Sequence, residues 1–215
     1  MRGVIFDLDG TLVDSLDDIT AALGVAFTAL GLAALERERV ERCVGDGARM
    51  LVRRALGARA EEAGRALEDD ALERFRAAYD ERLVVHTRAF DGVEALLSTL
   101  AARGTPTAVL SNKPHPMTRR VVEALFADHP FVEVLGQRPE VRRKPDPAAA
   151  LELAARLEVP PAELLFVGDT RVDVRTAQAA GMVSVGVTWG MRPPAELAEA
   201  DHRIDHPSAL LRLLE

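Results

Sequence analysis

The stretch that decides the fold lies near the start of the chain, where residues 4–11 read VIFDLDGT. A short apolar run that stops at aspartate, glycine and threonine is typical of a buried strand ending in a turn. We therefore predict a strand over Val4–Leu8. Two carboxylates, Asp7 and Asp9, stand at its carboxyl end.

The segment after this strand has a different pattern. From Leu16 to about Val85, apolar residues recur at helical spacing and no strand pattern is found. We predict a helical segment in four pieces. The breaks are expected near Gly31, Gly45–Gly47 and Gly57.

Beyond Phe90 the chain alternates between short apolar runs and helical segments. The predicted strands cover Thr107–Leu110, Phe131–Leu135, Leu164–Val167 and Val183–Val187. The predicted helices cover Val93–Ala102, Met117–Phe126, Pro147–Leu157, Thr170–Ala180 and Pro207–Leu214. This alternation predicts an α/β fold, a Rossmann-like parallel sheet core with helices on both faces and a helical cap inserted after the first strand. The core would comprise residues 1–14 and 87–215, and the cap residues 15–86.

The composition excludes several classes of protein. The 215 residues include 27 Lys and Arg against 34 Asp and Glu, a net charge of −7, which argues against a broad basic surface for nucleic acid or anionic membranes. The single cysteine, Cys43, excludes a disulfide framework and falls in the apolar frame of a predicted helix, which favours a core position. The longest uncharged stretch, Ile19–Leu35, is shorter than a membrane span. We expect a cytoplasmic monomer or homodimer that binds neither nucleic acid nor membrane.

Lysine is rare among the basic residues of this chain. Only Lys113 and Lys144 are lysines among the 27, and each stands beside a proline in a loop-like segment. A coding preference for arginine accounts for the other 25 basic residues but does not explain why two lysines remain. They are either chance survivors or positions that need a compact, flexible ammonium group.

Chemistry-bearing residues collect at the predicted strand ends, where open α/β sheets bind their ligands. In chain order they are Asp7, Asp9, Gly10, Thr11, Ser111, Asn112, Lys113, Arg142, Arg143, Lys144, Asp169, Thr170 and Asp173. Carboxylates from two strands make a hard oxygen site of the kind that Mg²⁺ prefers. A metal, a lysine and a hydroxyl around one carboxylate suit phosphoryl transfer, in which the carboxylate can act as nucleophile.

Structural interpretations of the same residues remain open at this point. Asp7 and Asp9 resemble the opening of a calcium loop, but the glycine that this loop needs at its sixth position is Leu12. Taken singly, each aspartate also fits a turn residue or a helix cap, as Asp169 and Thr170 do before a predicted helix. Their joint placement at strand ends favours function.

Four stretches together resemble the motifs of the haloacid dehalogenase superfamily of aspartate-nucleophile phosphohydrolases. They are residues 7–15 (DLDGTLVDS), 109–113 (VLSNK), 143–147 (RKPDP) and 167–173 (VGDTRVD). Their order and spacing match, and the resemblance covers the whole chain. It implies a magnesium-dependent phosphatase that acts on a small phosphorylated metabolite through an aspartyl-phosphate intermediate.

The resemblance also implies roles for individual residues. Asp7 attacks phosphorus, Asp9 protonates the leaving oxygen and then activates water, and Lys144 neutralises Asp7 and the transferring phosphoryl group. The residues implied in phosphate binding are Ser111, Asn112, Gly10 and Thr11. The implied Mg²⁺ ligands are Asp7, the backbone carbonyl of Asp9, and Asp169, with Asp173 supporting the metal or Lys144.

Within the predicted cap, residues 43–56 resemble the signature of the phosphoglycolate phosphatase group. Gly45 and Gly47 would let backbone approach a small substrate, and Arg49 is either a partner for its carboxylate or a solvated surface residue. Phosphoglycolate is therefore the favoured substrate. The alternatives within the superfamily are a phosphatase of another sugar phosphate, a pyrophosphatase and a sugar-phosphate mutase. A phospho-accepting regulatory domain is the alternative from another class.

Overall fold

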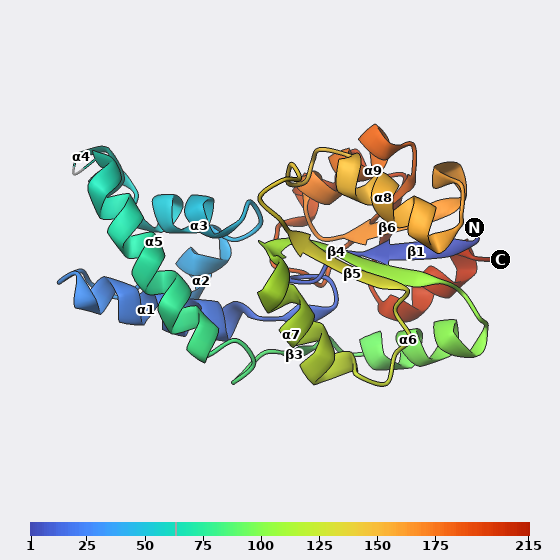
Figure 1. Cartoon of the computed structure of the whole chain (residues 1–215), viewed down its shortest axis with the longest axis horizontal. Coiled ribbons are helices and arrows are strands. Elements are labelled where there is room, and N and C mark those ends of the chain that lie inside the picture. Colours follow the sequence, from blue (N-terminus) through green and yellow to red (C-terminus); the bar gives the residue numbers. More distant parts are fainter. Residues whose placement is uncertain (63) are drawn as a thin grey trace. The chain divides into compact units, whose positions relative to one another are not determined.

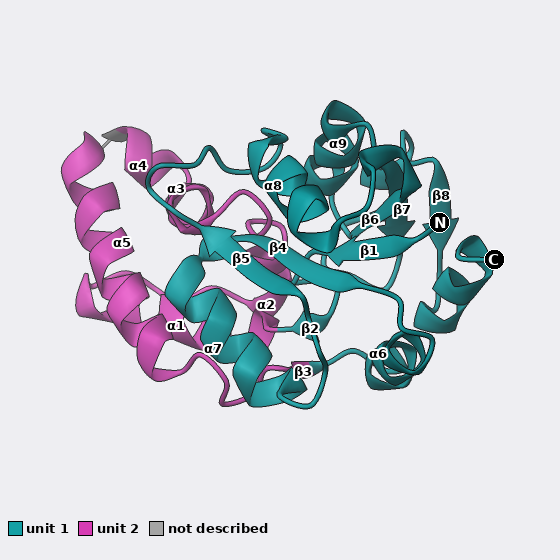
Figure 2. Cartoon of the chain, turned by 45° about the vertical axis from the view of Figure 1, so that its right-hand side comes forward, with its two compact units in different colours: residues 1–14, 89–215 teal, residues 15–88 magenta. Residues whose placement is uncertain are grey.

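The computed structural model describes residues 1–62 and 64–215 and divides the chain into two units (Figure 2). Unit 1 comprises residues 1–14 and 89–215, and unit 2 comprises residues 15–88. Unit 1 contains a six-stranded sheet with the order β5 (Glu133–Gln137), β4 (Thr107–Pro114), β1 (Gly3–Phe6), β6 (Leu164–Gly168), β7 (Val183–Val187) and β8 (His202–Ile204). Its strand pairings are parallel, which confirms the predicted α/β class.

Strand β1 lies inside the sheet because its residues are apolar on both faces. All four are buried, and Val4 pairs with Thr107 on one side and with Leu165 on the other. A Cβ atom at Gly3 would lie 2.9 Å from the side chain of Leu164, so glycine permits this close packing. The residues that follow β1 therefore emerge in the middle of the carboxyl edge of the sheet.

Helices cover both faces of this sheet. Figure 1 shows α8 (Ala148–Leu157) and α9 (Arg171–Ala180) on one face, and α6 (Val93–Ala102) and α7 (His115–Phe126) on the other. The core beneath α8 and α9 includes Ile5, Leu153 and Phe166, all at most 1% exposed. Short 3-10 helices complete the unit: η1 (Pro161–Glu163), η2 (Pro194–Leu197) and η3 (Pro207–Leu213).

Several element boundaries differ from the predicted ones. The strand predicted over Phe131–Leu135 runs instead over Glu133–Gln137, and the last predicted helix is the 3-10 helix η3. The sequence pattern gave no sign of β8, because only Ile204 of its three residues is buried and the strand lies at the sheet edge. Strand β4 extends past Leu110 to Pro114 and so carries the residues that were expected in a loop.

Unit 2 is helical between the short strands β2 (Val13–Asp14) and β3 (Arg88–Ala89), which pair where the chain leaves and re-enters unit 1. Its described helices are α1 (Leu16–Ala29), α2 (Arg37–Glu41), α3 (Ala48–Leu56), α4 (Ala58–Glu62) and α5 (Gly64–Glu81), five pieces where four were predicted. Helices α1 and α3 both pack against α5. Cys43 is buried as predicted, but it lies in the turn after α2, where its thiol donates to the Arg39 carbonyl at 3.2 Å. None of the described helices has both the length and the apolar character that a bilayer span requires.

The end of unit 2 is tied to its beginning by Asp18, which is 1% exposed. The Asp18 carboxylate accepts hydrogen bonds from the backbone N–H groups of Val85, His86 and Thr87 at 3.1, 2.9 and 2.8 Å, and from the Thr87 hydroxyl at 2.7 Å. An Asp18→Ala substitution removes every one of these acceptors. We expect it to lower the free energy of unfolding by about 3–5 kcal/mol, because buried N–H groups lose their partner.

The adjacent Asp17 gives a matched control for this prediction. It pairs with Arg37 at 2.7 Å, but both side chains are 43% exposed. Because exposed ion pairs contribute little, Asp17→Ala should cost less than about 1 kcal/mol. Urea denaturation followed by circular dichroism measures both values, and equal losses in the two variants would contradict the role given to Asp18.

Candidate active site

The predicted site residues of the core follow the carboxyl ends of β1, β4, β5 and β6, four neighbouring strands. The chain runs outward from β1 through β4 to β5 and then returns to β6 on the other side of β1. This reversal is the position at which open α/β sheets bind ligands. Asp7 follows β1 directly and Asp169 follows β6 directly, so the sheet brings them together.

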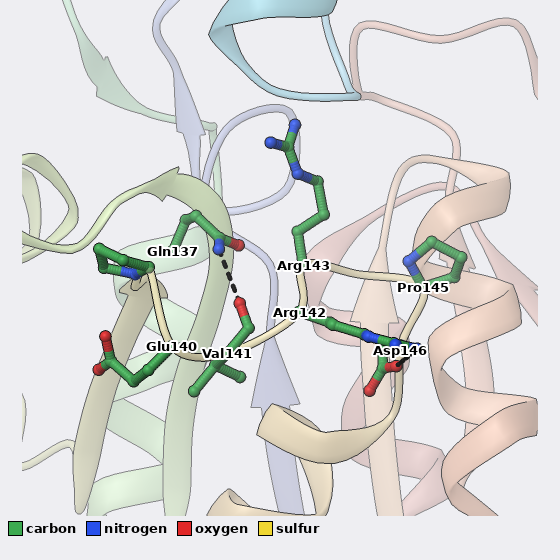
Figure 3. A pocket seen from close by; sticks show the side chains of 8 residues that line it. Gln137, Glu140, Val141, Arg142, Arg143, Pro145 and Asp146 are labelled. Carbon is green, nitrogen blue, oxygen red and sulfur yellow. Dashed lines mark hydrogen bonds and ion pairs between the residues drawn. The ribbon is translucent and has the colours of Figure 1, made fainter.

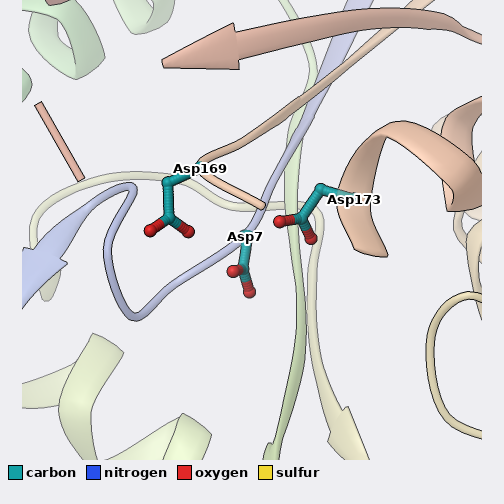
Figure 4. Close-up of side chains that lie close together, drawn as sticks. All are labelled: Asp7, Asp169 and Asp173. Atoms are coloured by element: carbon teal, nitrogen blue, oxygen red, sulfur yellow. The ribbon is translucent and has the colours of Figure 1, made fainter. Parts of the chain in front are cut away.

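Three aspartates form the centre of the site. Asp7, Asp169 and Asp173 each place a carboxylate oxygen within 4.8 Å of the others, and all three are buried. Figure 4 shows their side chains converging, with Asp173 coming from the first turn of α9. Negative charges this close in a buried place repel one another, so the cluster needs positive charge.

Lys144 supplies part of that charge. Its side chain is 3% exposed, and Nζ lies 2.8 Å from Asp7 Oδ1 and 2.7 Å from Asp173 Oδ1. Burial alone would lower the pKa of Lys144, but the charges of Asp173 and Asp7 outweigh it and raise the pKa, which keeps the ammonium charged. Asn112 holds the backbone of this lysine: its amide oxygen accepts from Lys144 N at 2.9 Å, and its amide nitrogen donates to Lys144 O at 3.2 Å.

Asp173 uses its two oxygens to hold other groups. Oδ1 accepts from Lys144, while Oδ2 accepts from the Thr170 hydroxyl at 2.7 Å and the Thr170 N–H at 3.1 Å. Together with the Thr170 hydroxyl, which accepts from Asp173 N at 3.4 Å, these contacts form a capping box at the start of α9. Thr170 is thus the cap of α9, and Asp173 connects this cap to Lys144.

Asp169 is the carboxylate of the cluster whose negative charge is least offset by neighbouring groups. Oδ2 accepts from the Met191 N–H at 2.9 Å, whereas the buried Oδ1 has no hydrogen-bond partner among the described residues. Burial, and then the charges of Asp173 and Asp7, raise the pKa of Asp169 well above its usual value. A carboxylate oxygen without a partner beside two further carboxylates fits a divalent cation with oxygen ligands.

Two glycines leave room for this carboxylate. A Cβ atom at Gly10, whose φ is +89°, would lie 2.3 Å from Asp169 Oδ2. A Cβ atom at Gly190 would lie 2.3 Å from Asp169 Cβ. Both glycines therefore pack against Asp169, a contact that the sequence analysis did not predict, while phosphate binding by Gly10 stays a prediction.

The protonation of Asp7 makes the binding of any cation at this cluster depend on pH. Burial raises the pKa of Asp7 to about 7, with Lys144 lowering it and Asp173 raising it further. Because the folded-state pKa lies above the usual value of 3.8, the folded protein binds the proton more tightly, and it loses stability as pH rises from about 4 to about 7. A cation that binds this cluster must displace protons.

We therefore expect the stabilisation by Mg²⁺ to grow with pH. Thermal melts with excess Mg²⁺ or with chelator, at about pH 5 and at about pH 8, measure the shift in Tm at each pH. The expected result is a clearly larger shift at the higher pH. NaCl at matched ionic strength is the control, and a Mg²⁺ shift that does not change with pH would contradict the prediction.

Asp9 has a partner, Lys113, that the sequence analysis placed at a strand end without giving it a role. Lys113 Nζ lies 2.8 Å from Asp9 Oδ1 and 3.1 Å from Oδ2, and the lysine side chain is 4% exposed. The scarcity of lysine in this chain was the signal that pointed to it. The hydroxyl of Ser111 accepts from Lys113 N at 3.2 Å, so the serine also lies at this end of β4.

Other contacts at this edge involve the loop after β1. Trp189, the only tryptophan, donates through Nε1 to the Thr11 carbonyl at 3.1 Å. The Thr11 hydroxyl is buried and has no hydrogen-bond partner among the described residues. The loop after β7, which also carries Gly190 and Met191, therefore supports the Asp7–Thr11 loop.

The two predicted cap contacts lie in unit 2. Arg49 donates to Glu68 at 2.8 Å and to Asp69 at 2.7 Å, so its charge is balanced within that unit. Gly45 has a φ of +121° and belongs to the loop before α3. Arg54 holds this loop through Asp46 at 2.5 Å and the Cys43 carbonyl at 3.3 Å.

A pocket of about 700 Å³ is lined by residues between β5 and α8, in the segment that also carries Lys144 (Figure 3). Its lining includes Gln137, whose amide donates to the Val141 carbonyl at 2.8 Å, and the exposed Arg142. None of the clustered aspartates lines it. The aspartate cluster at the strand ends is therefore the stronger candidate for the active site.

Comparisons with known proteins agree with this geometry. The family model described as haloacid dehalogenase-like hydrolase matches residues 4–187. The phosphoglycolate phosphatase of Pectobacterium atrosepticum is 36% identical over 100% of this chain and 92% of its own length. That of Rhodospirillum rubrum is 40% identical over 88% of this chain and 80% of its own length.

Solved structures show the same fold. A crystal structure from Lactobacillus delbrueckii subsp. bulgaricus matches with a TM-score of 0.94 and 29% identity, over 99% of this chain and 98% of that one. A predicted phosphoglycolate phosphatase from Haemophilus somnus matches with a TM-score of 0.90 and 30% identity, over 100% and 98%. The chain belongs to the haloacid dehalogenase-like hydrolases and is a phosphatase of that family.

Proposed function

We propose that this phosphatase hydrolyses a small phosphomonoester with Mg²⁺ through an aspartyl-phosphate on Asp7, and that phosphoglycolate is its substrate. The observation that carries the proposal is the position of Asp7: it is buried at the end of β1, 2.8 Å from Lys144 and beside Asp169. The substrate assignment rests on the relatives that are phosphoglycolate phosphatases.

Asp7 is proposed as the nucleophile and Asp9 as the general acid and base. A carboxylate oxygen of Asp7 forms a bond to phosphorus while the bond from phosphorus to the alcohol oxygen breaks, and Asp9 gives that oxygen a proton. Asp9 then takes a proton from water, whose oxygen attacks phosphorus and releases Asp7. Lys144 offsets the negative charge of Asp7 and of the phosphoryl group throughout.

Binding roles follow the same assignment. The proposed phosphate contacts are Ser111, Asn112, Gly10 and Thr11. The proposed Mg²⁺ ligands are Asp7, the Asp9 carbonyl and Asp169, whose Oδ1 has no hydrogen-bond partner among the described residues. When bound, Mg²⁺ would supply charge neutralisation at the phosphoryl oxygens. Asp173 is proposed as a support, because its two oxygens hold Lys144 and Thr170.

The helical unit is proposed as the cap. Its sequence begins at Ser15, shortly after the loop that carries Asp7 and Asp9. A lid of this kind excludes water and selects the leaving group.

Phosphate release tests the proposal. The panel contains phosphoglycolate, sugar phosphates and pyrophosphate, each with Mg²⁺ and with chelator. We expect release that depends on Mg²⁺ and is fastest with phosphoglycolate. Fastest release from pyrophosphate or from a sugar phosphate would contradict the substrate assignment. Isomerisation of a sugar phosphate without free phosphate would contradict hydrolysis.

A further inference from the structure

The buried pair of Lys113 and Asp9 places a cation beside the residue that is proposed above as the general acid. The ammonium contacts both oxygens of Asp9, and the Asp9 side chain is 17% exposed against 4% for Lys113. Asp9 is therefore the more accessible member of the pair. Lys144, by contrast, is held between Asp7 and Asp173.

The backbone of Lys113 is fixed by neighbouring elements. Its carbonyl accepts from the Thr118 hydroxyl at 3.1 Å, and its N–H donates to Ser111 Oγ at 3.2 Å. A Cβ atom at Gly136 of β5 would lie 2.6 Å from the same carbonyl, so a larger residue there would displace the end of β4. These contacts hold the backbone from which the lysine reaches Asp9.

The use of lysine and not arginine at position 113 is a further observation about this contact. Both lysines of the chain are buried against carboxylates at this one sheet edge, whereas the other 25 basic residues are arginines. An ammonium group is compact and can direct its three protons toward oxygens in different directions, whereas the donors of a guanidinium are fixed in one plane. Lys113 is suited to contact a second anion while it stays near Asp9.

The chemistry of the leaving group identifies this second anion as a carboxylate. This step rests on the proposed function, in which Asp9 gives its proton to the ester oxygen. In phosphoglycolate a single methylene separates that oxygen from the carboxylate. A cation that touches Asp9 therefore lies within reach of the carboxylate of a bound substrate.

We propose that Lys113 is a specificity-determining residue that binds a carboxylate on the alcohol half of the substrate. The substrate class is then a phosphate ester of a 2-hydroxy acid. Lys113 is shared between Asp9 and the substrate, so recognition of the carboxylate and positioning of the general acid occur at one ammonium group.

The test compares two esters of nearly equal size. The phosphate ester of glycolamide carries a neutral amide group where phosphoglycolate carries its carboxylate, so the ratio of the kcat/KM values for phosphoglycolate and this amide isolates recognition of the negative charge. We expect Lys113→Met to lower this ratio on the order of 10²-fold, because a buried charged contact is lost. Lys113→Arg should retain a larger part of the ratio, since it keeps the charge.

Arg142→Met is the matched control. It removes one positive charge from the same region, but its side chain is 88% exposed and is screened by solvent (Figure 3). We expect the ratio to change less than about threefold in this variant. A comparable fall in Arg142→Met would assign the effect to the general field and overturn the proposal.

The outcomes separate the inference from the function on which it rests. A wild-type enzyme that releases no phosphate from either ester, or that hydrolyses both equally well, contradicts the proposed function itself. A wild-type preference for phosphoglycolate that survives in Lys113→Met overturns only the role of Lys113. Loss of that preference in Arg49→Met with retention in Lys113→Met would assign carboxylate recognition to unit 2 instead.

Discussion

Asp7→Asn is expected to lower kcat for phosphate release by roughly 10⁴-fold or more, because the amide oxygen is too weak a nucleophile to form the acyl phosphate. The fold should persist. Asparagine has nearly the same shape, its oxygen still accepts from Lys144, and the change removes a buried carboxylate whose pKa is raised to about 7 by burial. Near pH 8 the Tm measured with chelator should equal or exceed that of the wild type.

Asp17→Asn is the control for this substitution, since it makes the same chemical change at an exposed carboxylate of unit 2. Its activity should stay within about twofold of the wild type. Phosphate release and a thermal melt by circular dichroism decide the outcome. Asp7→Asn protein that folds and keeps activity within about tenfold of the wild type would remove Asp7 from the nucleophile role.

Lys144→Met should damage both stability and turnover. Asp7 and Asp173 would remain buried without the ammonium that contacts each of them, and breaking a buried ion pair in this way costs about 3–5 kcal/mol. Turnover should fall by roughly 10²–10³-fold or more, because the charge that offsets the transferring phosphoryl group is gone. Urea denaturation and kcat measured on the folded fraction give the two values.

A double variant separates these two effects. In Lys144→Met/Asp173→Asn, one of the carboxylates that lost its partner is neutral, so we expect the free energy of unfolding to recover by at least about 1 kcal/mol. Turnover should not recover, because the missing charge at Asp7 is not replaced. Stability of Lys144→Met within about 1 kcal/mol of the wild type would contradict the buried-pair argument, and so would recovery of activity in the double variant.

The elements that could be predicted are those with a strong local signal. An apolar run followed by Asp-Gly or Gly-Asp identified the strands that became β1 and β6, because burial on both faces demands such runs in a parallel sheet. The same reasoning predicted that Asp7 and Asp169 lie at one edge of the sheet. Strand β8 was missed because an edge strand with exposed His202 and Arg203 lacks that signal.

Contacts that depend on side-chain packing could not be predicted. Asp9 and Lys113 are separated by 104 positions, and no local sequence pattern indicates that the lysine contacts that carboxylate. The packing of Gly190 against Asp169 likewise exists only once the loop after β7 lies beside the loop after β1. For Arg49, the sequence indicated a cation but not that Glu68 and Asp69 of α5 already balance it.

The position of β1 has a consequence for how the protein is made. Of the described strands it is made first, yet its partners are β4 and β6, and Phe6 pairs with Val109 and Val167. Between them the ribosome adds unit 2, which is continuous in sequence and rich in short-range helical contacts. The nascent chain therefore carries its proposed nucleophile without a partner strand until β4 is made, and with a partner on one side of β1 until β6 is made. If Asp169 holds Mg²⁺ as proposed, a chain that stalls before β6 lacks a metal ligand and is expected to be inactive.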